Sequence, residues 1–158
     1  MSTLNLAKVG SKAPAFTTEN QHGQKVSLKD FKGRKVVLYF YPKAMTPGCT
    51  TQACGIRDHQ EEFQQLNTVV LGISPDAPKR LIKFIEKESL NFDLLSDEDH
   101  SIAEKYGVWG LKKFMGREYD GIHRITFIID EDGKVASVMP KVTTKTHHDD
   151  VLAVIRSL

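Results

Sequence analysis

The chain has only two cysteines, no long apolar run and no strong excess of charge of either sign. Lys and Arg total 22 and Asp and Glu total 20 among 158 residues, which gives a formal net charge of +2. A charge this balanced provides no basic patch strong enough to predict nucleic-acid binding. No stretch approaches the roughly 18 apolar residues of a membrane span, and the opening segment MSTLNLAKVGSKAP lacks the apolar core of a secretion signal. We therefore expect a cytoplasmic protein that binds neither nucleic acid nor membrane.

Two cysteines are also too few for the disulfide scaffold of a small secreted protein. Both of them, Cys49 and Cys54, fall inside the segment YFYPKAMTPGCTTQACGIRD. In a reducing compartment, a close pair of cysteines more often serves catalysis or metal binding. The length suits one domain with a substantial core, and we expect residues 1–158 to form a single domain.

Apolar runs alternate with helical patterns along the chain. Strand-like runs, two of them around an early Gly-containing turn, lie within 16–28, 34–41, 68–74, 92–96, 124–130 and 134–139. Helical patterns lie at 47–66, 78–88, 101–107 and 146–158. This order predicts an α/β fold with an N-terminal β-hairpin and a central mixed β-sheet flanked by helices.

Cys49 is predicted to lie in the first turn of a helix, because a strand-like run ends in Thr46-Pro47-Gly48 just before the helical pattern. Free N–H groups and the positive end of the helix dipole favour a thiolate there, and the thiolate is the nucleophilic form. A helix end supplies about 0.3 to 2 kcal/mol, whereas making the thiolate dominant at neutral pH requires ~3 to 4 kcal/mol. A permanent cation should therefore lie beside the sulfur.

Arginine is the best such cation, because it stays charged and can hold sulfur and oxygen together through its fork. Arg57 lies eight residues along the same predicted helix, roughly 12 Å from Cys49, and is too distant. We expect the cation to be Arg124, which opens the strand-like segment HRITFIID.

Each of these residues also has a purely structural interpretation. Cys49 lies on an apolar stripe and could be an ordinary buried thiol. Thr46 is a good helix N-cap before Pro47, and Pro42 could simply end a strand. Arg124 could be a surface arginine at a strand edge.

Two other functions remain open from the residues alone. A general disulfide oxidoreductase relies on C-x-x-C, whereas this chain has C-x-x-x-x-C. A zinc-binding or interaction module would need ligands from the two cysteines and the histidines, but structural zinc spacings are absent. The histidines are scattered at His22, His59, His100, His123, His147 and His148. We interpret the acids that follow His148, and those in the segment SDEDH, as helix N-termini, and we expect neither metal nor cofactor.

The segment Pro42-Lys43-Ala44-Met45-Thr46-Pro47-Gly48-Cys49 matches the P-x-x-x-T-x-x-C signature of peroxiredoxins. Cys54, with SDEDH, GVWG and YDGIHR downstream, resembles the bacterioferritin comigratory protein, or peroxiredoxin Q, subgroup. The resemblance runs from about Val9 to the C-terminus and implies a thioredoxin-like fold. It also implies a thiol peroxidase for hydrogen peroxide and organic hydroperoxides, with thioredoxin as reductant, glutaredoxin as the alternative, and a monomeric state.

The resemblance assigns a role to each residue of the site. Cys49 would attack the peroxide and become a sulfenic acid, and Cys54 would resolve it as a disulfide. Thr46 would hydrogen-bond the peroxide or the sulfur, Pro42 would shield the sulfur from water, and Arg124 would be the active-site arginine.

Helix geometry adds one expectation about the cysteine pair. Positions five apart in an α-helix have Cα atoms roughly 8 to 9 Å apart, whereas a disulfide needs about 4.4 to 6.8 Å. The first turns of the helix should therefore unwind before Cys49 reaches Cys54. The low helix propensity of Gly48 favours this unwinding.

Overall fold

The computed structural model describes residues 4–158 of the chain. Over this range the strands are β1 (Thr17–Asn20), β2 (Lys25–Ser27), β3 (Lys35–Phe40), β4 (Thr68–Ser74), β5 (Leu94–Ser96), β6 (Trp109–Phe114), β7 (Arg117–Ile122), β8 (Thr126–Ile129) and β9 (Val135–Met139). The α-helices are α1 (Pro47–Asp58), α2 (Gln60–Gln65), α3 (Pro78–Glu88), α4 (Ser101–Tyr106) and α5 (His147–Arg156). A short 3₁₀ helix spans Leu28–Phe31.

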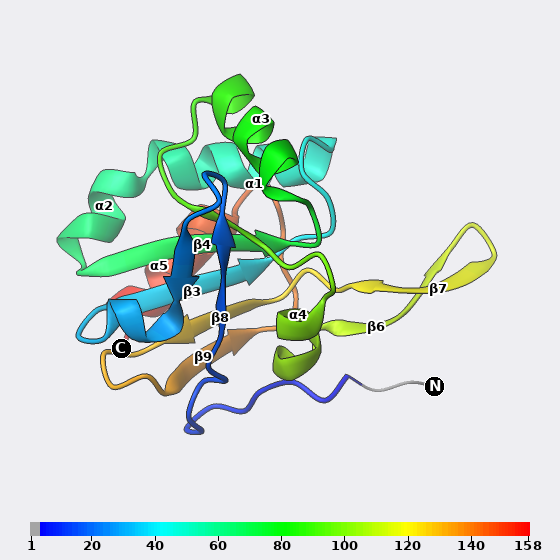
Figure 1. The fold of residues 1–158 in the computed structure, drawn as a ribbon. Helices are drawn as coiled ribbons and strands as arrows, with labels where there is room; N and C mark the ends of the chain where they lie inside the picture. The colour runs from blue at the N-terminus through cyan, green and yellow to red at the C-terminus, as the bar shows by residue number, and fades with distance from the viewer. Residues whose placement is uncertain (1–3) are drawn as a thin grey trace.

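A mixed seven-stranded sheet with the order β2-β1-β5-β4-β3-β8-β9 forms the centre of the molecule (Figure 1). Strands β3, β4 and β5 are parallel, and the remaining pairings in this sheet are antiparallel. The predicted N-terminal hairpin is present as β1 and β2. The sheet therefore has the mixed character that the alternation of strands and helices predicts.

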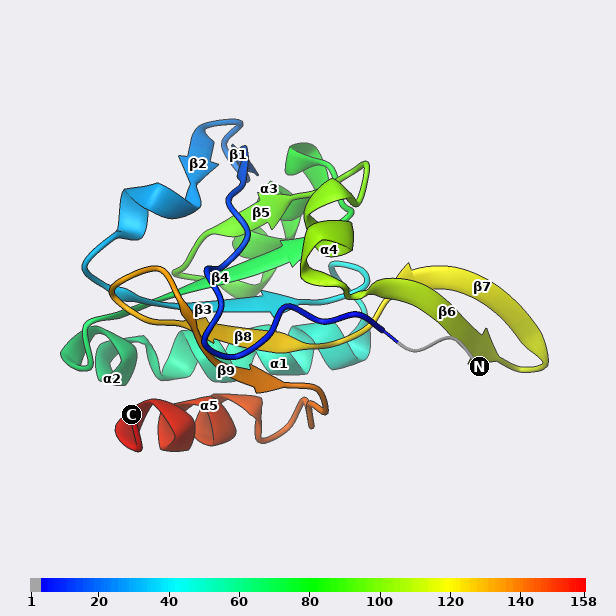
Figure 2. The same ribbon diagram turned by 90° about the horizontal axis from the view of Figure 1, so that it is seen from below.

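Alternate side chains of β3 enter two separate cores. Leu38 and Phe40 pack with α4, whereas Val37 and Tyr39 pack with α1, α3 and α5. Figure 2 shows α4 on the side of the sheet away from α1 and α5. A strand buried on both faces reads as a continuous apolar run in the sequence, which explains the run 34–41.

The helical pattern at 47–66 forms two helices instead of the single one predicted. In a continuous helix the His59 N–H would bond to the Gly55 carbonyl. Here Nδ1 of the His59 ring forms a hydrogen bond with the Gly55 carbonyl at 2.8 Å instead. The backbone N–H of His59 bonds to the Ile56 carbonyl. The chain therefore bends at His59, between α1 and α2.

The hairpin of β6 and β7 was absent from the sequence prediction. It extends away from the rest of the molecule in both ribbon views (Figures 1 and 2). Its two turn residues, Met115 and Gly116, have φ values of 51° and 78°. Positive φ at both positions fits a two-residue hairpin turn, for which Asn-Gly is the usual sequence. Here methionine stands in place of asparagine, so the sequence does not indicate the turn.

Among residues 4–158, no helix is both long and apolar enough to cross a membrane.

Candidate active site

The sheet topology brings Arg124 to the start of α1. Strand β3 leads through a loop into α1, and β8 runs antiparallel to β3 with Thr126 opposite Tyr39. The Phe40 N–H donates to the Ile125 carbonyl at 3.0 Å. The residues just before β8 therefore lie beside the residues just after β3, although they are about 80 positions apart in sequence.

The loop between β3 and α1 is held by an aspartate in the segment after β4 and by an arginine in the first turn of α3. Asp76 accepts the Ala44 N–H at 2.8 Å and the Ser74 hydroxyl at 2.8 Å. Arg80 donates to the Ala44 carbonyl at 2.8 Å and pairs with Asp76 at 3.1 Å. Met45, next in the chain, has φ of 66°, a strained conformation for a residue with a side chain. These contacts fix the position from which α1 begins.

Cys49 lies in the first turn of α1, and its side chain is buried. Nη1 of Arg124 donates to its sulfur over 3.3 Å. The guanidinium also lies against the preceding residue, because a β-carbon at Gly48 would be in ordinary van der Waals contact with Nη2 of Arg124, at 3.5 Å. The structure thus puts one thiol, one guanidinium and the free N–H groups of a helix start together.

The guanidinium is oriented by a chain of buried polar side chains. The same Nη1 donates to Oε1 of Gln52 at 2.8 Å. Because Oε1 accepts from Arg124, the amide nitrogen of Gln52 is the donor to His147 Nδ1, at 3.2 Å. Nε2 of His147 then carries the ring proton and donates to Thr126 Oγ1 at 2.8 Å. Gln52, His147 and Thr126 are each fully buried.

His147 is neutral at ordinary pH. Burial lowers its pKa from the usual value near 6.5 to about 4, outweighing the nearby Asp150 carboxylate, which acts in the opposite direction. A neutral imidazole can accept through Nδ1 and donate through Nε2 at once, as the chain of bonds from Gln52 to Thr126 requires.

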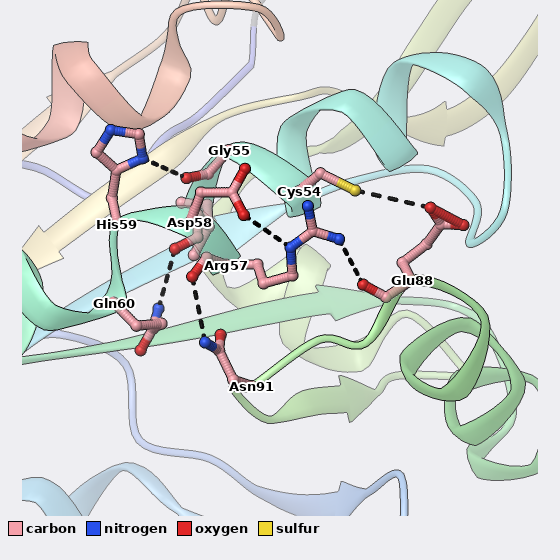
Figure 3. A network of polar contacts seen from close by, with 9 residues as sticks. Cys54, Gly55, Arg57, Asp58, His59, Gln60, Glu88 and Asn91 are labelled. Atoms are coloured by element: carbon pink, nitrogen blue, oxygen red, sulfur yellow. Dashed lines mark hydrogen bonds and ion pairs between the residues drawn. The ribbon is translucent and has the colours of Figure 1, made fainter.

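Cys54 lies on the same helix in a different environment (Figure 3). Its Sγ donates to Oε1 of Glu88 at 3.7 Å. Burial raises the pKa of Cys54, Arg57 lowers it, and the Glu88 carboxylate raises it further. Cys54 is therefore held mainly as a thiol at neutral pH.

The half of α1 that carries Cys54 is tied to α3 and the segment after it. Arg57 Nη1 donates to the Glu88 carbonyl at 2.6 Å, and the Asn91 side chain donates to the Arg57 carbonyl at 3.1 Å. Figure 3 shows these contacts on one side of the helix. Arg57, which the sequence placed too far from Cys49 to act on it, lies instead beside Cys54.

The other two predicted site residues lie around the start of α1. Thr46 is the N-cap residue, as predicted, but its hydroxyl donates to the Lys43 carbonyl at 2.8 Å and makes no cap hydrogen bond. Pro42 lies half-buried in the loop after β3. Both cysteines are free thiols.

Sequence reasoning missed Gln52, His147, Glu88 and Lys112. Gln52 lies three residues after Cys49, on the helical face that turns toward Arg124, and helix spacing could have indicated it. The burial of His147 and the approach of Glu88 depend on how α5 and α3 pack, which no local pattern encodes. Lys112, on the unpredicted β6, has its pKa lowered by burial and by the charge of Arg124, whereas Cys49 raises it.

A family model described as the AhpC/TSA family matches residues 9–138. The chain belongs to this family. It is 61% identical over 155 residues to a putative peroxiredoxin bcp of Haemophilus influenzae, covering 98% of this chain and 100% of the relative. It is 56% identical over 149 residues to peroxiredoxin Bcp of Escherichia coli K12, covering 94% and 96%. The protein is thus a peroxiredoxin of the Bcp type, a thiol peroxidase, as the sequence motif predicts.

The fold of this peroxiredoxin is shared by a solved relative. The bacterioferritin comigratory protein of Xanthomonas campestris, whose structure concerns alkyl peroxide reduction, superposes with a TM-score of 0.87 at 30% identity. The match covers 98% of each chain. The predicted thioredoxin-like peroxiredoxin fold, with its mixed sheet and flanking helices, is confirmed.

Proposed function

We propose that this peroxiredoxin reduces hydrogen peroxide and organic hydroperoxides, and that Cys49 is the sulfur that attacks them. The observation that carries the proposal is Arg124 Nη1 at 3.3 Å from Cys49 Sγ, at the start of α1. The alkyl peroxide activity named for the Xanthomonas campestris relative supports the substrate class. The physiological role would be antioxidant defence and redox homeostasis.

The first step is attack by the Cys49 thiolate on the terminal peroxide oxygen. The S–O bond forms as the O–O bond breaks, and the leaving oxygen departs as water or an alcohol after taking a proton. Arg124 and the first-turn N–H groups stabilise the negative charge that spreads over the oxygens. The Thr46 hydroxyl donates a hydrogen bond to the Lys43 carbonyl, so its oxygen is free to accept a hydrogen bond from the peroxide. Pro42 is proposed to shield the sulfur.

Cys54 then resolves the Cys49 sulfenic acid. Its thiol condenses with the sulfenic acid to form an intramolecular disulfide, and water leaves. Both cysteines lie on one continuous helix, α1, so this step requires the helix to unwind. An external dithiol reduces the disulfide by thiol exchange. Thioredoxin is the proposed reductant, and glutaredoxin is the alternative.

Several properties of the protein go with this proposal. The reaction needs no cofactor, because the two thiols supply both electrons. We further propose that residues 1–158 act as one domain, as a cytoplasmic monomer.

Replacement of each cysteine tests the proposal. Cys49→Ser should abolish peroxide consumption, because serine cannot be oxidised in this way. Cys54→Ser should allow one stoichiometric oxidation but should block turnover with thioredoxin. Substantial turnover by Cys49→Ser would refute the proposal. Insulin reduction measured in parallel separates a peroxidase from a general disulfide oxidoreductase.

A further inference from the structure

Three metal-ligand side chains that are scattered in the sequence come together between α1 and α5. His59 lies at the bend between α1 and α2, whereas His148 and Asp149 lie in the first turn of α5. One ligand atom from each lies within 4.8 Å of the other two. The two imidazole rings are stacked, with centroids 4.3 Å apart and planes inclined by 27°.

His59 is oriented as a metal-bound histidine usually is. Its Nδ1 pairs with the Gly55 carbonyl at 2.8 Å, so the ring proton is on Nδ1 and the lone pair is on Nε2. In protein metal sites, the second ring nitrogen commonly donates to a backbone carbonyl in this manner, which fixes the tautomer and the ring plane. Figure 3 shows the His59 ring directed back to Gly55.

Hydrogen bonding does not account for the position of His148. Nδ1 of this ring is buried and has no hydrogen-bond partner within residues 4–158. The ring packs so closely on α1 that a β-carbon at Gly55 would lie 2.3 Å from this nitrogen. A buried polar atom without a partner is unfavourable. The other nitrogen, Nε2, lies 3.5 Å from Oδ2 of Asp149.

Two carboxylates surround the histidine pair and supply negative charge. Asp149 is one, and Glu62 is the other, with Oε1 at 3.9 Å from Nε2 of His59. The second oxygen of Glu62 is held by Arg156 at 3.0 Å. Two imidazoles, from His59 and His148, and two carboxylates, from Asp149 and Glu62, can thus offer nitrogen or oxygen ligands to a cation.

We propose that His59, His148 and Asp149 form a binding site for a divalent transition-metal ion, with Zn²⁺ as the reference ion. Two imidazoles and a carboxylate are a ligand set that suits zinc, copper or nickel better than calcium or magnesium. Tetrahedral zinc with ligands at about 2.0 to 2.1 Å needs ligand atoms roughly 3.3 Å apart. Binding requires rotation of the exposed Asp149 carboxylate and smaller adjustments of the two half-buried imidazole rings, because the ligand atoms now lie within 4.8 Å of one another.

The bound ion would join α1 to α5. Its ligands come from the C-terminal end of α1, the helix that carries both cysteines, and from the start of α5. The ion would therefore stabilise the folded protein by mass action. This site is distinct from the sulfur and guanidinium of Cys49 and Arg124, and it departs from the expectation that the histidines bind no metal.

The test is zinc binding by tag-free protein whose cysteines have been replaced, Cys49→Ser with Cys54→Ser, so that thiols cannot bind the metal. Equilibrium dialysis and calorimetry with Zn²⁺ should give one saturable ion per chain. His59→Gln and His148→Gln should each weaken binding by at least about 10- to 100-fold, the loss that removal of an outer-shell partner alone causes. His22→Gln, which removes an exposed histidine in the β1–β2 turn, is the matched control. It should bind Zn²⁺ as tightly as the cysteine-free protein, the parent of these variants.

Thermal unfolding provides a second readout that does not depend on activity. Zn²⁺ should raise the Tm of the parent and of His22→Gln, but not that of His59→Gln. Circular dichroism checks that each variant folds, and Asp149→Asn replaces His148→Gln if that variant is unfolded, because Asp149 is exposed. Undiminished affinity in the ligand variants, or no saturable binding by the parent, would overturn the proposal.

Discussion

Arg124 is held in place by a chain of three buried polar residues. Gln52 accepts a hydrogen bond from Nη1 of Arg124 and donates one to His147, which in turn donates to Thr126. All three residues are buried. Low dielectric surroundings strengthen such a chain of hydrogen bonds, and each broken bond leaves a buried group without a partner. The position of the guanidinium relative to Cys49 therefore depends on a glutamine amide.

Replacement of this amide should impair peroxide reduction. Gln52→Leu removes the acceptor for Arg124, and the misplaced guanidinium should lower kcat/KM for peroxide about 10- to 100-fold. Gln52→Glu keeps an acceptor and should retain more activity than Gln52→Leu. Stopped-flow kinetics measures the effect, with the exposed Gln65→Leu as control. Equal activity of Gln52→Leu and the parent would show that Arg124 needs no such support.

Removal of the guanidinium itself should have a larger effect. Arg124→Met preserves much of the apolar stem but leaves the developing negative charge without its main cation. Loss of a single such stabilising group typically costs about 100- to 1,000-fold. The exposed Arg117→Met on β7 is the matched control in the same peroxide assay. A loss of less than severalfold would contradict the role proposed for Arg124.

The charge on Glu88 should control the acidity of the second cysteine. Burial raises the pKa of Cys54 most, Arg57 lowers it, and Glu88 raises it further. Glu88→Gln removes the negative charge and leaves Arg57, so the pKa of Cys54 should fall. Thiolate absorbance against pH, measured in the Cys49→Ser background, reports Cys54 alone. The exposed Glu86→Gln is the control, and an unchanged or higher pKa in Glu88→Gln would count against this account.

Helix α1 is anchored unevenly along its length. Its second half is tied to α3 and the following segment through Arg57, Glu88 and Asn91. Its first half contains Gly48, a residue of low helix propensity, and is held at its end by the Gln52 side chain, which bonds to Arg124 and His147. Local unfolding is drawn from the least stable parts of a structure.

Formation of the disulfide should therefore unwind the first half of α1. Amide exchange in the oxidised protein, compared with the reduced one, should increase at 48–52 and change little at 56–58. Cys54→Ser treated with the same peroxide is the control, because it cannot form the disulfide. Increased exchange confined to 56–58, or no increase in either half, would be incompatible with the expected motion.

The elements of the central sheet were predictable because their patterns are local. The doubly buried β3 reads as one apolar run, and α3 was placed with its observed bounds. The bend at His59 was not predictable, because it arises where the His59 side chain, instead of its backbone N–H, bonds to the Gly55 carbonyl. The hairpin of β6 and β7 was missed because Met115 occupies a turn position where asparagine is usual.

The predicted site divides in the same way. Cys49, Thr46 and Pro47 lie at a helix start that local spacing defines. Arg124 was chosen from its charge and from the resemblance to peroxiredoxins, and the pairing of β3 with β8 is what brings it to Cys49. Gln52 and His147 make bonds across α1 and α5, which only the packed molecule determines.

At the scale of the whole molecule, the buried His147 links the active site to acid stability. Its pKa is near 6.5 when unfolded and about 4 when folded, so the unfolded chain binds more protons between these values. Stability should accordingly fall as pH drops from about 6.5 toward 4, by up to roughly 3 kcal/mol.

Urea unfolding at several pH values in this window measures the effect. His147→Gln retains hydrogen-bonding capacity but does not titrate there, so its stability should vary less with pH than that of the parent. The comparison subtracts the contributions of the carboxylates that titrate in both proteins. Identical pH dependence in the two proteins would show that the histidine is not buried in its neutral form.

Mass spectrometry of the reduced protein after one equivalent of peroxide tests the role of Cys49 most directly. Cys49 should be oxidised first, and the product should be an intramolecular Cys49–Cys54 disulfide, whereas Cys54→Ser should stop at the Cys49 sulfenic acid. Oxidation that begins at Cys54, or that proceeds equally well in Cys49→Ser, would contradict this role.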